Sequence, residues 1–168
     1  MNHNDDWPDV PPIFGGRDTP FQTCTLDEVR SFEQQHDLEL HWQYRQFLMH
    51  FDGGRPEGGS IQAMTGTDEI YGIMALHPLI DRRGDEVDLY SQVNWDEFIP
   101  RDLLSIGGDG SGNWYCIAVR NKARGAIFFV DHEKPMDHFL RVVILAPDFD
   151  TFCANAIPPD PRMWAGTD

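Results

Sequence analysis

The feature that most restricts the fold is a glycine-rich segment followed by two apolar runs, LLSIGGDGSGNWYCIAVRNKARGAIFFVDHE, which begins at Leu103. Its first residues, Leu103–Ile106, predict a short strand, and the glycines within residues 107–112 permit backbone conformations that are closed to other residues. The runs Asn113–Arg120 and Ala126–Asp131 are rich in β-forming residues and are joined by a short polar turn that ends in glycine. This arrangement predicts a β-hairpin.

Both faces of the first hairpin strand are apolar. Trp114 and Cys116 are expected to point to one face, whereas Tyr115, Ile117 and Val119 point to the other. A strand that is apolar on both faces usually lies in the middle of a sheet that is covered, at least in part, on both sides. The hairpin is therefore predicted to form the centre of the sheet.

Helical patterns precede this sheet. Thr25 can cap the first helix, and Glu28, three residues later, can complete a capping box. The second helix is the clearest in the chain, because its apolar residues repeat at i, i+3, i+4 and i+7 and a glycine pair follows them. The residues on this apolar face are Tyr44, Phe47, Leu48 and Phe51.

Further strands are predicted over residues 61–64, 70–76 and 139–145, and a short helix is predicted to begin near Asp88. Helices come first, strands follow, a final helix closes the chain, and no βαβ repeat is present. This order favours an α+β fold, with a central, mostly antiparallel sheet and helices packed against it.

The closing helix and the chain ends complete the predicted organisation. Pro147 and Asp148 suit a helix start. The residues expected on the buried face of that helix are Phe149, Phe152, Cys153 and Ala156. One domain is expected over residues 25–157, between a proline-rich arm at 1–24 and a proline-rich tail at 158–168.

Three parts of the chain resemble the SUKH superfamily. The central motif is carried by Leu104-Ser105-Ile106-Gly107, Asp109, Gly112, Tyr115, Cys116, Gly125, Phe128 and Asp131-His132-Glu133. Tyr44–Leu48, with the glycines that follow, is similar to the second helix of the family, and Phe149–Phe152 is similar to the start of its closing helix. The resemblance spans residues 25–157 in the family's order. The chain departs at His41-Trp42, where the family commonly has Leu-Pro, so this helix is expected to start differently.

The resemblance implies a function in protein binding. Members of the superfamily are known as immunity proteins of bacterial polymorphic toxin systems and as regulators of fungal cell-wall assembly. The resemblance therefore implies a non-catalytic immunity protein that occupies a cognate toxin. The alternative is an intracellular interaction or regulatory module with no toxin partner.

The charge balance restricts the possible partners. The chain has 13 Lys and Arg residues against 28 Asp and Glu residues, a net charge of −15. Such a surface repels phosphate backbones, so nucleic acid and anionic membranes are poor partners. It attracts basic proteins, and it also keeps a protein in solution.

The cysteines and the N-terminal residues favour a reducing cytoplasm, and the resemblance implies a bacterial one. Cys24, Cys116 and Cys153 are odd in number and far apart, which indicates neither a zinc ribbon nor a disulfide scaffold. Cys116 and Cys153 lie in apolar stretches and are predicted to be core residues. The polar, acidic residues 1–6 have no apolar run behind them, so no signal peptide or membrane span is predicted.

The sequence offers little catalytic chemistry. The glycine-rich segment leads into a strand, whereas a dinucleotide-binding loop opens a helix, and Ser111 lacks the spacing of a nucleophile elbow. The best metal-like cluster is Asp131, His132, Glu133, Asp137 and His138, but His132 would face away from its neighbours on a strand. A small metal-dependent hydrolase using His132 and His138 is a less favoured alternative, and no cofactor or metal is predicted.

The expected partner is a basic, nuclease-type toxin, because carboxylates can stand in for phosphate at sites rich in Lys and Arg. Residues 81–97, termed here the acidic segment, form the densest acidic stretch outside the chain ends, next to a predicted sheet edge. The contact residues expected from the sequence are Asp81, Asp85, Glu86, Asp88, Asp96, Glu97 and Asp109, with Tyr90 and Trp95 as aromatic anchors.

Overall fold

A five-stranded antiparallel sheet organises the computed structural model, which describes residues 22–54, 59–64, 69–73, 75–84, 87–93 and 97–156. In spatial order, its strands are β3 (Ala75–Leu76), β4 (Leu103–Gly108), β5 (Trp114–Ala118), β6 (Ile127–Val130) and β7 (Val142–Ala146). The predicted hairpin is confirmed as β5 and β6, which pair in antiparallel register from Trp114↔Val130 to Ile117↔Ile127. The central position of β5 is confirmed as well.

The two faces of β5 contribute to two separate apolar clusters, as its sequence predicts. Tyr115 and Ile117 are buried in the main core with residues from the helices. Cys116 is buried on the opposite face with Ile99 and Val130, and Trp114 packs there partly exposed. The main core lies under the helices, and among the described residues the opposite face carries the smaller cluster.

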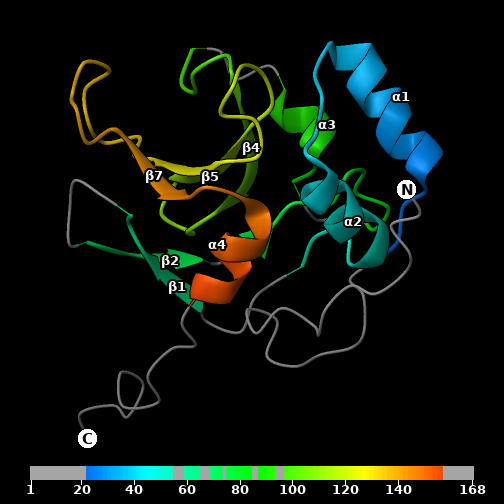
Figure 1. The fold of residues 1–168 in the computed structure, drawn as a ribbon, viewed down its shortest axis with the longest axis horizontal. Helices are drawn as coiled ribbons and strands as arrows, with labels where there is room; N and C mark the ends of the chain where they lie inside the picture. The colour runs from blue at the N-terminus through cyan, green and yellow to red at the C-terminus, as the bar shows by residue number, and fades with distance from the viewer. Residues whose placement is uncertain are drawn as a thin grey trace, which may run out of the picture.

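In the described ranges, four helices contribute to the main core: α1 (Leu26–His36), α2 (Trp42–His50), α3 (Leu89–Gln92) and α4 (Phe149–Asn155). The predicted capping box of α1 is present, because Glu28 N–H donates to Thr25 Oγ1 at 3.2 Å and Thr25 N–H donates to Glu28 Oε2 at 2.8 Å. In Figure 1, α1, α2 and α3 lie together on one side, and α4 lies between the large sheet and the small one. The α+β prediction is therefore confirmed.

Strands β1 (Gly59–Gln62) and β2 (Ile70–Ile73) form a separate two-stranded sheet, and this sheet shows that one prediction is wrong. The sequence predicts one strand over residues 70–76, but the chain divides into β2 and β3, which belong to different sheets. An apolar pattern predicts which residues are buried but not which strand they pair with, so it could not predict where one strand ends and the next begins. The hydroxyl of Tyr115, which donates to the Gly72 carbonyl at 2.7 Å, joins the two sheets.

The glycines of residues 107–112 have two different functions. Gly107 and Gly108 belong to β4, and a Cβ on Gly107 would lie 2.4 Å from the Ala75 carbonyl oxygen. Gly107 is therefore required for the close approach of β3. The turn itself uses Gly110 and Gly112, whose φ angles of 82° and 94° favour glycine. The expectation of unusual backbone at all four glycines is thus correct for the last two only.

Strand β7 starts later than predicted. Phe139, which was expected in a buried strand over residues 139–145, is 80 % exposed and lies in the loop that precedes Val142. Pro135 and Asp137 are turn-forming residues in that loop, and they give the physical reason for the late start. The loop at residues 131–141 is the orange loop at the upper left of Figure 1.

The predicted closing helix and the buried cysteines are confirmed. Asp148 caps α4 by accepting from Thr151 N–H at 2.8 Å, and Phe149 and Phe152 are fully buried. The three cysteines are free and buried. Apart from residues 22–24, the predicted arm lies outside the described residues, as does the predicted tail.

Candidate partner-binding surface

Carboxylates of the acidic segment hold its described residues in place. Asp88 caps α3 by accepting from Ser91 N–H at 2.9 Å, and it also accepts from Asp81 N–H at 3.0 Å. Asp81 accepts from Arg83 N–H at 3.0 Å. The structure therefore brings Asp81 and Asp88 together. Both carboxylates order the local backbone while they remain partly exposed.

Tyr90 packs against the first helix. Its ring lies 4.9 Å from that of Phe32 and 5.4 Å from that of His36, measured between ring centroids. Tyr90 is half-buried at the margin of the main core, so a partner would reach only part of its ring.

Of the other predicted contact residues, the structure describes Glu97 and Asp109, which lie on different segments. Glu97 is exposed. Asp109 lies after the end of β4, where its carboxylate accepts from the N–H groups of Ser111 and Asn113 at 2.8 and 3.1 Å. Asp109 thus closes the glycine turn. The remaining predicted residues, Asp85, Glu86, Trp95 and Asp96, lie outside the described residues.

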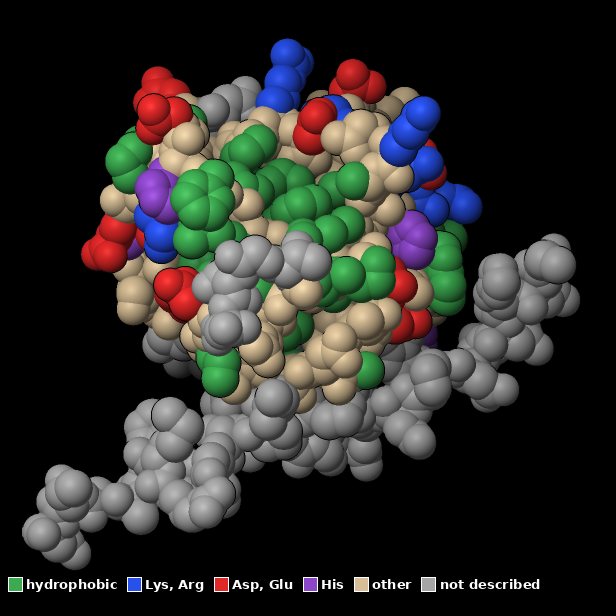
Figure 2. Space-filling view, turned by 60° about the vertical axis from the view of Figure 1, so that its left-hand side comes forward, with side chains coloured by type: hydrophobic (Ala, Val, Ile, Leu, Met, Phe, Trp, Pro, Cys, Tyr) green, Lys and Arg blue, Asp and Glu red, His purple; other side chains and the backbone are tan. Residues whose placement is uncertain are grey.

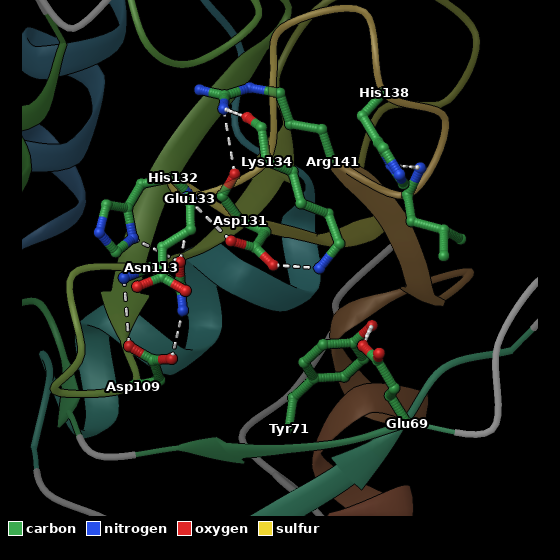
Figure 3. Close-up of polar contacts among 11 residues, drawn as sticks. Glu69, Tyr71, Asp109, Asn113, Asp131, His132, Glu133, Lys134, His138 and Arg141 are labelled. Carbon is green, nitrogen blue, oxygen red and sulfur yellow. Dashed lines mark hydrogen bonds and ion pairs between the residues drawn. The ribbon is translucent and has the colours of Figure 1, made fainter.

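A polar network joins the glycine turn to the loop at residues 131–141 (Figure 3). The side-chain amide of Asn113 donates to Asp109 Oδ2 at 2.8 Å. Its oxygen accepts from His132 N–H at 2.9 Å and lies 2.7 Å from His132 Nδ1. Two loops that are distant in the sequence are therefore fixed side by side at one end of β5.

The network does not form a metal site. His132 is bound to Asn113, whereas His138 Nδ1 accepts from Leu140 N–H at 3.1 Å and its ring stacks on Phe139. Asp131 forms an ion pair with Lys134. Within the described ranges, no three His, Cys, Asp or Glu side chains are grouped so that they could hold a metal ion.

Sequence reasoning missed the residues that shape the loop at residues 131–141. Arg141 is 5 % exposed, and its guanidinium reaches back from the end of the loop to donate to the main-chain carbonyls of Asp131 and Lys134 in its first half. Met136 and Phe139 project from this loop into solvent. The adjacent turn-forming residues were the available signal, but the apolar run at residues 139–145 concealed them.

The comparison with known families agrees with this architecture. The profile of the SMI1 / KNR4 family (SUKH-1) matches residues 23–155, a range that contains every helix and strand described above. The chain belongs to that family. A comparison with curated proteins finds no match.

The family assignment confirms the resemblance seen in the sequence. The SUKH-1 match includes the hairpin, the glycine turn, and helices α2 and α4, which are the parts that carried the resemblance. The departure at His41-Trp42 lies at the start of α2, where His41 occupies the N-cap position without a side-chain capping bond. None of the helices in the described ranges is long and apolar enough to cross a membrane.

In this SUKH-1 domain, His77 makes stability depend on pH beside the acidic segment. Burial lowers the pKa of His77 to about 4, and the nearby carboxylate of Asp88 opposes this shift only partly. Because the folded protein favours the neutral ring, stability that is present above the unfolded pKa of about 6.5 is lost as the pH falls towards 4.

We expect His77→Gln to remove this dependence. Between pH 7 and pH 4, the wild type should lose about 2–3 kcal/mol more unfolding free energy than the variant, because only the wild type must protonate an imidazole whose pKa is lowered in the folded state. Urea denaturation of both proteins across this pH range measures the difference. If the unfolding free energies of the two proteins fell equally with pH, the folded state would not hold the His77 ring neutral, and the prediction would be wrong.

Proposed function

We propose that this SUKH-1 protein is a bacterial immunity protein that neutralises a cognate nuclease-type toxin by direct binding and without catalysis. The family assignment supports the proposal, because SUKH proteins bind partner proteins and include toxin immunity proteins. The observation that carries the choice of a basic toxin is the net charge of −15. A chain of this charge associates rapidly with a basic protein, which matters when a toxin must be bound before it cuts nucleic acid.

Among the described carboxylates, those paired with basic side chains differ from those that no partner engages. Glu28, Glu33, Glu39 and Asp131 form ion pairs with basic side chains. Glu97, Glu133 and Asp137 are exposed, and within the described residues no hydrogen bond or ion pair engages their carboxylates. Such carboxylates can meet the Lys and Arg side chains with which a nuclease holds phosphate.

The proposed contact surface includes the acidic segment and Asp109. Its residues are Asp81, Asp85, Glu86, Asp88, Tyr90, Trp95, Asp96, Glu97 and Asp109. Asp81 and Asp88 support this role because their local hydrogen bonds hold them in fixed positions. A preorganised carboxylate loses less conformational entropy on binding than a mobile one does.

Co-purification from the source bacterium tests the function. The expected partner is a basic protein with nuclease activity that one equivalent of this chain abolishes. A partner that has no toxic activity, or a nuclease that stays active in the complex, would contradict the immunity function.

Neutralising part of the acidic segment should slow association. Asp81→Asn with Asp88→Asn should lower the association rate severalfold at low salt, and adding Asp85→Asn and Glu86→Gln should bring the loss to roughly tenfold. Asn keeps one acceptor oxygen, which can preserve the N-cap at position 88, but it cannot also accept from Asp81 N–H as the second carboxylate oxygen of Asp88 does. The free energy of unfolding should therefore fall by about 1 kcal/mol, and both variants should remain folded. Stopped-flow binding to the purified partner, at low and high salt, measures the rates.

The control changes the same charge on another element. Asp148→Asn with Asp150→Asn removes two carboxylates from α4, and it also replaces one N-cap Asp with Asn. The control should slow association much less, because exposed charges are screened beyond about 10 Å at 0.1 M salt. Equal effects of the two double variants would mean that the net charge acts as a whole and that the acidic segment is not the contact surface.

A further inference from the structure

A buried arginine fixes the loop at residues 131–141. Arg141 Nη1 donates to the carbonyl of Asp131 at 3.1 Å and also to the carbonyl of Lys134. Arg141 Nη2 donates to the carbonyl of Phe98 at 3.1 Å. Burial of a cation is costly unless its donors are satisfied, so this arrangement strongly favours one conformation of the loop and of the segment at Phe98.

The segments joined by Arg141 present large apolar side chains to solvent. The exposed fractions are 80 % for Phe139, 66 % for Met136 and 46 % for Phe98. The ring of Phe98 lies 6.3 Å from that of Trp114, which extends this surface towards the partly exposed margin of the smaller cluster. These three side chains, Phe98, Met136 and Phe139, are termed here the Phe139 face.

A single exposed apolar residue needs no explanation, but this group lies on segments that one guanidinium holds together. Figure 2 brings the left-hand side of Figure 1 forward and shows hydrophobic side chains across the middle of that side, with charged side chains along its border. An apolar centre with a polar border is the usual composition of a protein–protein interface.

The charges next to the Phe139 face indicate what kind of partner fits it. Glu97 precedes Phe98, and Glu133 and Asp137 lie on the same loop as Met136 and Phe139. All three carboxylates are exposed, whereas the nearby Lys134 is paired with Asp131. The border of the face is therefore acidic, and the complementary surface is apolar at its centre and basic at its edge.

We propose that the Phe139 face docks into an apolar depression on a basic protein and forms the hydrophobic centre of the interface. The proposal rests on the proposed function in one respect: the same basic partner is taken to contact both this face and the acidic segment. A second copy of the chain is disfavoured as the occupant, because two surfaces of the same acidic charge repel each other. Arg141 is a positioning residue for this face.

The test compares two exposed apolar sites. Met136→Ser with Phe139→Ser should raise the dissociation rate of the purified partner at least tenfold, since aromatic residues and Met are enriched in interface cores and a few central side chains carry most of the binding energy. Trp42→Ser is the control, because Trp42 is 50 % exposed on α2 and lies outside the Phe139 face. The control should change the dissociation rate less than twofold. All substituted residues are exposed, so thermal unfolding should confirm that both variants stay folded.

The outcomes separate this inference from the proposed function. If neutralising the acidic segment slows association but Met136→Ser with Phe139→Ser leaves the dissociation rate unchanged, the proposed docking role of the Phe139 face is wrong. The proposed immunity function is then unaffected. If the double variant releases a basic partner that is not a toxin, the docking face stands and the immunity function fails. If the wild type sediments as a dimer and Met136→Ser with Phe139→Ser sediments as a monomer, the face serves self-association and the proposal is overturned.

Discussion

Phe47→Ala should lower the free energy of unfolding by about 3–5 kcal/mol, because it removes a fully buried aromatic ring and leaves a cavity. The ring of Phe47 lies 5.0 Å from that of Phe149, 5.8 Å from that of Tyr44 and 5.9 Å from that of Phe51, between centroids. It therefore connects α2 with α4. Phe51→Ala should give a loss at the lower end of this range, because Phe51 retains 8 % exposure.

Urea denaturation measures both losses, and Trp42→Ala provides a control on the exposed side of the same helix. The Trp42 side chain is 50 % exposed, so its removal should cost well under half as much as the removal of Phe47. A change of less than 1 kcal/mol for Phe47→Ala would mean that the core face of α2 is wrongly assigned.

Arg141→Met should lower the free energy of unfolding by about 2–4 kcal/mol, because main-chain carbonyls on three residues lose their donor and an unsatisfied buried polar group costs about 1–3 kcal/mol. The Met side chain replaces the apolar stem of Arg141 and omits only the guanidinium group, so the loss reports the hydrogen bonds more than the packing of the stem. Arg141→Lys should recover only part of the loss, because one ammonium group cannot reproduce the planar fork of guanidinium donors.

Chemical denaturation and proteolysis together check this prediction. Arg101→Met is the control, because Arg101 is exposed, and it should change stability by less than about 0.5 kcal/mol. We also expect faster cleavage within residues 131–141 in Arg141→Met than in the wild type, since the loop loses its closure. Wild-type stability and wild-type cleavage in this variant would show that Arg141 does not fix the loop.

The sequence predicted those parts of the fold in which local pattern and burial agree. The double-sided apolar run at residues 113–120 indicated the central strand, and the spacing of Tyr44, Phe47 and Leu48 indicated the buried face of α2. Thr25 and Glu28 are a local signal that needs no tertiary information, and their capping box is present. In each case, the residues that carry the pattern also make the contacts.

Prediction failed where distant contacts determine the structure. Residues 70–76 continue one apolar pattern, yet the chain changes its partner strand between Ile73 and Ala75. Phe139 was assigned to a strand on hydrophobicity alone, whereas Arg141 draws the backbone into a closed loop through carbonyls that no sequence pattern displays. The register of a strand and the targets of a buried guanidinium are properties of the assembled protein.

The candidate surface was predictable from the sequence only through its charge. The acidic segment is visible in the composition, but the use of Asp88 as a helix cap and the packing of Tyr90 on α1 depend on the fold. The exposure of Phe139 could not be read from residue type, because aromatic residues are more often buried. Charge density therefore indicated a class of partner, and the fold was needed to identify an apolar face.

The three buried thiols can be used to time the opening of different parts of the domain. Burial raises the pKa of the Cys24 thiol to about 12, with the carboxylates of Asp52 and Glu28 adding to the shift, and burial also raises the pKa of Cys116 and Cys153. Thiols in this state react with an alkylating reagent only when the surrounding structure opens. Cys24 lies against α2, Cys116 in the central strand and Cys153 in the closing helix. Mass spectrometry of the labelled chain can therefore follow these three regions separately, with no probe added to the protein.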